Sequence, residues 1–134
     1  MMKDVLKFLT DNPTFYIATC TPEGPRVRPF GFIMEDGGKL YLTTSNQKDV
    51  FKQLQADPRF ELSATSADGC SWIRVRGKAV FDTRREIAEK AFKTADFFEM
   101  LFQSPDNPIM EFFYISEGEA VFYSFTEPPK TVKF

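Results

Sequence analysis

Most of this chain consists of short β-rich segments separated by turn sequences. The segments cover residues 15–20, 25–34, 39–44, 59–65, 71–81, 110–116 and 119–125. The sequences between them, TPEG at 21–24, DGG at 36–38, ADG at 67–69 and EG at 117–118, are typical of turns. We therefore expect a three-stranded meander over residues 15–44 and a hairpin at 117–118. Because closure hides the edges of a sheet, many short strands favour a closed or partly closed antiparallel barrel.

Three segments have helical periodicity, at residues 2–11, 47–56 and 84–102. The second presents Val50, Phe51 and Leu54 as one apolar stripe, so it should lie on the barrel surface with that stripe inward. The prediction is a mainly β protein with peripheral α-helices. The chain has 134 residues and no repeat, low-complexity tract or linker, so we expect residues 1–134 to form a single domain.

The chain has no histidine, which excludes Ser-His hydrolases, Cys-His proteases and almost every zinc enzyme. No metal site is expected, and any chemistry must come from a cofactor or from carboxylates. Cys20 and Cys70 lack the CxxC spacing of redox and zinc motifs, so we expect both to be reduced and structural.

Charge and hydropathy also exclude several partners. The net charge of −2 argues against nucleic acid or an anionic membrane surface. The first residues are too charged for a secretory signal, and no apolar run reaches the ~20 residues of a membrane span. We expect a cytoplasmic protein.

The sequence TTSNQK at residues 43–48 lies between a predicted strand and a predicted helix. Hydroxyl groups, free backbone N–H groups and the Lys48 ammonium converge there on a helix N-terminus, where a phosphate is readily bound. Lys48 could instead be a solvated lysine, and the hydroxyls could reflect β-propensity followed by an N-cap. A cation in the first helical turn opposes the helix dipole, however, which favours a phosphate-bearing ligand.

The segment before it, residues 26–33, is predicted to be a strand with Arg28 and Phe30 on one face. Pro29 cannot donate a ladder hydrogen bond, so this strand should lie at an edge or beside a bulge. Its free backbone groups could bind a planar ring while residues 43–48 bind a phosphate tail. Flavin mononucleotide (FMN) fits both requirements.

Four motifs occur in a recognisable order: RPFGF at 28–32, KLYLTTSNQK at 39–48, DPRF at 57–60 and SWIRVRGKA at 71–79. This order resembles the FMN-binding split barrels related to pyridoxamine 5'-phosphate oxidase, in the short branch of general stress proteins and nitroimidazole reductases. The likeness covers roughly residues 14–82. It implies a six-stranded antiparallel Greek-key split β-barrel that forms a homodimer with FMN at the interface.

The resemblance also implies a set of cofactor-binding residues. Arg28 and Lys48 match the phosphate-binding pair of the family, and Trp72 begins the strand that reaches the flavin from the second subunit. Phe30 could equally be a core residue and Trp72 an interface anchor. Arg74 and Arg76 could be interface ion pairs or substrate handles. The full set of candidates is Arg28, Pro29, Phe30, Thr43, Thr44, Ser45, Asn46, Lys48 and Trp72.

The expected activity is an FMN-dependent oxidoreduction of a small molecule, with NAD(P)H as a candidate electron donor. Pyridoxal phosphate synthesis is not expected, because the C-terminal arginine and histidine that bind substrate in true pyridoxamine-phosphate oxidases have no counterpart before Phe134. The alternative is a non-catalytic protein that stores or senses FMN, or one that binds heme or a deazaflavin. A barrel that binds no cofactor is a third hypothesis.

Overall fold

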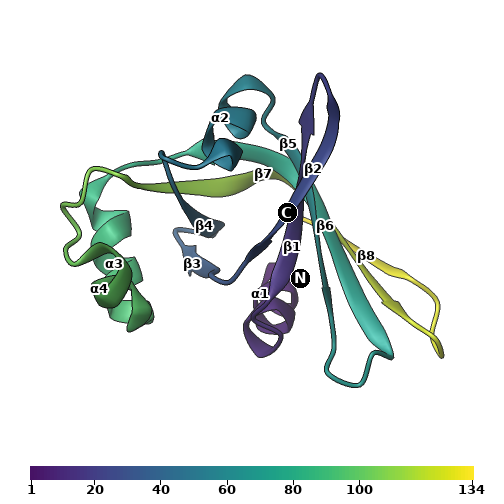
Figure 1. Cartoon of the computed structure of the whole chain (residues 1–134). Coiled ribbons are helices and arrows are strands. Elements are labelled where there is room, and N and C mark those ends of the chain that lie inside the picture. Colours follow the sequence, from purple (N-terminus) through teal and green to yellow (C-terminus); the bar gives the residue numbers. More distant parts are fainter.

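The computed structural model describes residues 1–134 as one eight-stranded antiparallel sheet with four helices around it (Figure 1). The strands are β1 (Phe15–Thr21), β2 (Gly24–Phe30), β3 (Met34–Asp36), β4 (Lys39–Ser45), β5 (Arg59–Thr65), β6 (Ser71–Phe81), β7 (Met110–Ser124) and β8 (Lys130–Lys133). The helices are α1 (Met2–Asp11), α2 (Asp49–Ala56), α3 (Arg85–Thr94) and α4 (Phe97–Phe102). The predicted fold class is confirmed, with eight strands rather than six, because the short strands β3 and β8 pair at the margins of the sheet.

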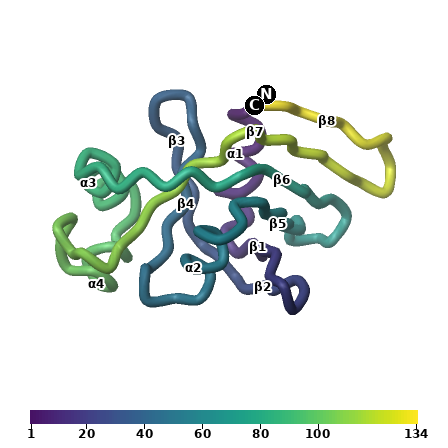
Figure 2. Tube along the Cα trace, turned by 90° about the horizontal axis from the view of Figure 1, so that it is seen from above, coloured from purple at the N-terminus to yellow at the C-terminus, as the bar shows by residue number.

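The strands follow the order β2-β1-β5-β6-β7-β4-β3, and β8 pairs with β7. β2 and β3 therefore lie at opposite ends of the path, and the sheet does not close between them (Figure 2). The predicted meander over residues 15–44 is wrong, because β2 pairs with β1 whereas β4 pairs with β3 and β7. The edge position of β2 is confirmed, and it explains how Pro29 is accommodated in a strand.

Two hydrophobic clusters lie on opposite faces of the sheet. The larger fills the barrel, where α1 contributes Val5 and Leu9 and α2 contributes Val50 and Leu54. The smaller lies between β4 and β7 and the pair α3 and α4, which form an arm at one end of the molecule (Figure 1). This arm covers only part of the outer face of the sheet.

The arm contains two helices, whereas a single helix was predicted over residues 84–102. Ala95 is extended, with φ −141° and ψ 130°, and it ends α3. The break lets Phe98 pack edge-on against Phe32, with ring centroids 4.7 Å apart. Burial of these aromatic rings against the sheet therefore outweighs the local preference for one continuous helix.

β7 runs continuously from Met110 to Ser124, so the predicted hairpin at residues 117–118 is wrong. Both halves of β7 pair with β6, and the register shifts at Gly77, which faces Glu117 and Gly118. Gly118 exchanges two backbone hydrogen bonds with Phe134, at 2.8 and 2.9 Å. The Glu-Gly pair is therefore a β-bulge that bends the strand.

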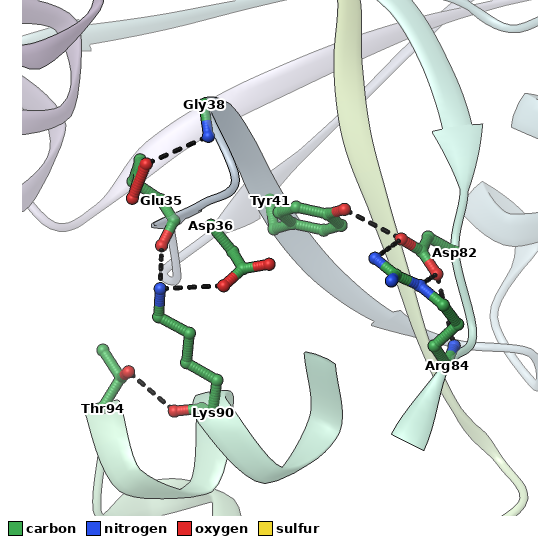
Figure 3. A network of polar contacts seen from close by, with 8 residues as sticks. All are labelled: Glu35, Asp36, Gly38, Tyr41, Asp82, Arg84, Lys90 and Thr94. Carbon is green, nitrogen blue, oxygen red and sulfur yellow. Dashed lines mark hydrogen bonds and ion pairs between the residues drawn. The ribbon is translucent and has the colours of Figure 1, made fainter. Parts of the chain in front are cut away.

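A polar network ties the arm to the sheet (Figure 3). Tyr41 on β4 donates a 2.8 Å hydrogen bond to Asp82, which also accepts from Arg84, and Lys90 on α3 pairs with Asp36 at 3.0 Å. Burial, assisted by Asp82, raises the pKa of Tyr41 to about 12. Hydrogen bonds from Arg84 and Tyr41 lower the pKa of Asp82 to about 2. Asp82 is thus a stable anion that joins the end of β6 to the start of α3.

Cys20 and Cys70 are free thiols, as predicted, but both are exposed. The prediction that they are structural is therefore wrong, because neither packs in a core. The longest helices have ten residues, and none is long and apolar enough to cross a membrane.

Candidate functional site

The junction of β4 and α2 is built as the sequence motif predicts. β4 ends at Ser45, and Lys48 is the extended N-cap residue of α2, with φ −97° and ψ 150°. No side chain caps the helix, so its first N–H groups have no side-chain acceptor. An anion at this position would accept hydrogen bonds from those groups and interact favourably with the helix dipole.

Thr44 provides the clearest sign of a ligand. Its side chain is 4% exposed, and its hydroxyl is the one buried side-chain polar atom in the structure without a hydrogen-bond partner. Leaving such a group unsatisfied costs about 1–3 kcal/mol. The neighbouring Ser45 hydroxyl, by contrast, accepts a hydrogen bond from the Gln47 backbone N–H at 3.1 Å. The Thr44 hydroxyl is therefore a buried donor without a partner.

Arg28 lies on the inner side of β2 and reaches α2. Its guanidinium donates to the Ile17 carbonyl at 3.2 Å, to Thr19 Oγ1 at 3.0 Å and to Gln53 Oε1 at 2.5 Å. Partial burial lowers the pKa of Arg28, and the nearby carboxylate of Asp49 opposes this shift. An arginine remains protonated in any such environment, so a half-buried positive charge lies beside the first turn of α2.

All acceptors of Arg28 are neutral, and this distinguishes it from the other arginines. Each of the others has a carboxylate oxygen within 4.0 Å: Arg26, Arg59, Arg74, Arg76, Arg84 and Arg85. Lys48 is exposed and also forms no ion pair or side-chain hydrogen bond. Two cations without a paired carboxylate therefore flank the N-terminus of α2.

Thr43 and Asn46 are occupied in holding the turn. Thr43 Oγ1 donates to the Glu111 carbonyl at 3.0 Å. The Asn46 side-chain amide donates to the Pro108 carbonyl and to a Glu111 carboxylate oxygen, both at 2.9 Å. These bonds fix residues 43–48 against β7, so the side chains of Thr43 and Asn46 anchor the turn, whereas the Thr44 hydroxyl and the Lys48 ammonium have no hydrogen-bond partner.

Pro29 and Phe30 are neighbours on the edge strand β2, but their side chains differ in burial. Pro29 is exposed, whereas the ring of Phe30 packs in the barrel core near Phe15 and Phe113, with centroids 6.4 and 6.3 Å away. A ligand along this edge would meet the Phe30 backbone rather than its ring.

Trp72 is not brought near the other candidates within one chain. It is the second residue of β6, and Phe81, the last, packs on Phe51 of α2. The two residues are nine positions apart along the strand, which corresponds to about 30 Å. Trp72 instead stacks on Tyr123, with centroids 5.4 Å apart and ring planes at 9°.

Arg74 and Arg76 lie on the outer face of the sheet, away from α2. They form ion pairs with Glu61 at 3.2 Å and with Glu119 at 2.8 Å. Within one chain, both arginines therefore behave as members of surface ion pairs.

Thr19 and Gln53, which both bond Arg28, were not among the site residues predicted from the sequence. Thr19 is polar but 1% exposed, at an inward position of β1. Gln53 follows Asp49 by four residues, so both face Arg28 from α2. The period-two pattern of β1 could have predicted that Thr19 points inward. Nothing in the sequence of α2 indicates that Gln53 bonds Arg28 on β2.

Comparisons with known proteins give a family match and several similar structures. A family model described as pyridoxamine 5'-phosphate oxidase matches residues 1–119. A NimC/NimA family protein from Clostridium acetobutylicum is 37% identical and superposes with a TM-score of 0.94, covering 99% of this chain and 92% of that chain. The sequence has no match among curated proteins.

Two more distant structures share the fold. General Stress Protein 26 from Bacillus anthracis is 14% identical, with a TM-score of 0.76 over 98% of this chain and 97% of that chain. PhzG from Burkholderia lata, solved with tetrahydrophenazine-1-carboxylic acid, is 11% identical, with a TM-score of 0.70 over 99% and 89%. At these identities the matches show the fold alone.

Proposed function

Because this chain belongs to the pyridoxamine 5'-phosphate oxidase family, we propose that it binds FMN and catalyses oxidoreduction of a small molecule. One observation carries the proposal. The N-terminus of α2 combines two cations that lack a paired carboxylate with the unsatisfied hydroxyl of Thr44. This set of donors matches the charge and the acceptor oxygens of a phosphate monoester.

In this proposal Arg28 and Lys48 neutralise the phosphate dianion, and Thr44 donates its hydroxyl to a phosphate oxygen. Ser45 and the first N–H groups of α2 complete the ring of donors. Asp49 is an adverse charge at the first turn of α2, and its carboxylate moderates the positive potential at Arg28. Thr43 and Asn46 hold the turn in place through Glu111.

The backbone of β2 at Pro29 and Phe30 would border the ring system, since β2 has a neighbouring strand on one side only. Bound FMN supplies hydride and one-electron transfer, and the protein orients it and controls what reaches it. The chain has no imidazole, so protons must pass through water, the substrate or a carboxylate. Pyridoxal phosphate synthesis is not part of this proposal.

Titration with FMN and with riboflavin tests the proposal directly. We expect FMN to bind with the two-band absorbance of an oxidised flavin, and riboflavin to bind at least about 100-fold more weakly, because it lacks the charge-assisted bonds to phosphate. Equal affinity for the two flavins would contradict the phosphate site. A Soret band in the purified protein would favour the heme alternative.

The same sample tests whether the bound flavin can be reduced, as the catalytic part of the proposal requires. Anaerobic NADH or NADPH is expected to bleach the bound flavin, because hydride transfer needs no protein acid or base. If no nicotinamide reduces the flavin, the storage or sensor alternative gains support. Rapid pyridoxal phosphate formation would overturn the proposed reaction class.

We also propose that the active species is a homodimer in which Trp72 of one copy reaches the flavin of the other. Trp72 lies about 30 Å along β6 from the residue that packs on α2, which supports a contact with the flavin of another copy rather than with that of its own chain. The uncovered outer face exposes Tyr16, Val27 and Phe125, at 53%, 66% and 75%, which supports an apolar contact between copies. Light scattering should give twice the chain mass of 15.4 kDa. A monomer at micromolar concentration would rule out the shared site.

A further inference from the structure

We propose that Gln53 and Thr19 form a neutral clamp that positions the Arg28 guanidinium for an anion without cancelling its charge. The inference rests on the proposed function, because the anion it serves is the FMN phosphate. Gln53 and Thr19 are positioning residues, since they act through Arg28.

The clamp is a closed triangle of hydrogen bonds between three elements. Arg28 on β2 donates to Thr19 Oγ1 at 3.0 Å and to Gln53 Oε1 at 2.5 Å. Thr19 on β1 donates its own hydrogen to Gln53 Oε1 at 2.7 Å. Thr19 is 1% exposed, so this hydroxyl has no competing solvent. The guanidinium is thereby fixed relative to α2, the helix whose N-terminus forms the proposed phosphate site.

The acceptor that Gln53 offers to Arg28 is a neutral amide oxygen and not a carboxylate. A glutamate at position 53 would have nearly the same shape and would hold Arg28 more strongly, because a charge-assisted hydrogen bond exceeds a neutral one. Every other arginine of the chain does have a carboxylate partner. An amide oxygen at this one position orients the guanidinium without pairing it with a carboxylate, so no ion pair competes with a ligand.

The clamp predicts a variant in which FMN affinity falls without a loss of stability. Gln53→Glu keeps the acceptor oxygen but introduces a carboxylate that pairs with Arg28. We expect the FMN dissociation constant to rise about 10- to 100-fold, with riboflavin affinity unchanged and the unfolding midpoint unchanged or higher. A purely structural role would predict that affinity for both flavins falls together with stability.

Gln55→Glu is the matched control, because Gln55 is exposed on the same helix and has no side-chain hydrogen bond. It adds the same charge to α2 without touching Arg28, and we expect at most about a twofold change in FMN affinity. If Gln53→Glu behaves like this control while the wild-type protein binds FMN, the clamp is refuted and the proposed function stands. Loss of stability in Gln53→Glu would also refute it.

If FMN fails to bind, titration with inorganic phosphate tests the clamp independently of the FMN proposal. Calorimetric titration of wild type, Gln53→Glu and Gln55→Glu with phosphate reports on the anion site alone. Weaker phosphate binding in Gln53→Glu only would support the clamp and refute the FMN proposal. A wild-type protein that binds neither FMN nor phosphate would refute both.

Discussion

An Arg28→Ala, Lys48→Ala double variant is expected to bind FMN about 100- to 10,000-fold more weakly than the wild-type protein. Each charge-assisted hydrogen bond to the phosphate contributes about 1.5–3 kcal/mol, and every 1.4 kcal/mol is about a factor of ten in affinity. Each single variant should therefore lose about 10- to 100-fold. Riboflavin affinity should change little, because riboflavin has no phosphate. Quenching of flavin fluorescence on binding measures the FMN dissociation constants of the wild-type protein, the two single variants and the double variant.

Lys52→Ala is the control, because Lys52 is an exposed lysine of α2 with no ion pair. It removes one positive charge from the same helix and should leave FMN affinity within about twofold. Lys48 is also exposed, so Lys48→Ala should not shift the unfolding midpoint. If the Lys48→Ala protein is folded and binds FMN as tightly as wild type, Lys48 is not in the site. Parallel loss of riboflavin affinity would place the flavin elsewhere.

Elements whose determinants are local could be predicted from the sequence. The segment 2–11 ends at a helix stop, and α1 spans Met2–Asp11. The stripe of Val50 and Leu54 predicted α2 and the face that it buries. Pro29 predicted an edge strand from a single property, its missing N–H donor. Each of these depends on residues that are neighbours in sequence.

Features that depend on distant partners could not be predicted. A Glu-Gly pair is typical of a hairpin turn, but here it forms a bulge, because both halves of β7 pair with the same strand and Gly118 bonds to Phe134. The two-helix arm has the same kind of cause, since Phe98 packs on Phe32 far away in sequence. The unclosed path between β2 and β3 likewise follows from pairings made elsewhere in the sheet.

In the candidate site, too, features with local determinants could be predicted from the sequence, whereas features that depend on distant residues could not. The strand, turn and helix order at residues 43–48 could be predicted, and so could the shared face of Arg28 and Phe30 on one strand. Sequence could not show that Thr44 keeps a free hydroxyl while Thr43 and Asn46 are bonded to β7. These differences arise from the pairing of β4 with β7, which brings together residues more than sixty positions apart.

The bulge in β7 makes a second large effect predictable, this time on stability. A methyl group on Gly77 would lie 2.7 Å from Ile115 Cγ2 and 2.9 Å from the Ser116 carbonyl oxygen. The oxygen belongs to the backbone of a paired strand, so it cannot move without disturbing the β6–β7 ladder. A side chain at this position therefore forces the paired strand to shift, although the φ of Gly77 is not in the left-handed region.

We expect Gly77→Ala to lower the free energy of unfolding by about 1–3 kcal/mol, as overpacking of a close backbone contact does. Gly31→Ala is the matched control, because its added methyl would meet only the Pro13 carbonyl oxygen at 3.8 Å, an ordinary contact. That variant should stay within about 0.5 kcal/mol of wild type. Urea unfolding of the three proteins measures the difference. Equal stability of Gly77→Ala and wild type would mean that β7 relaxes freely at the bulge, so that the bulge does not fix the path of the strand that carries Glu111 to the site.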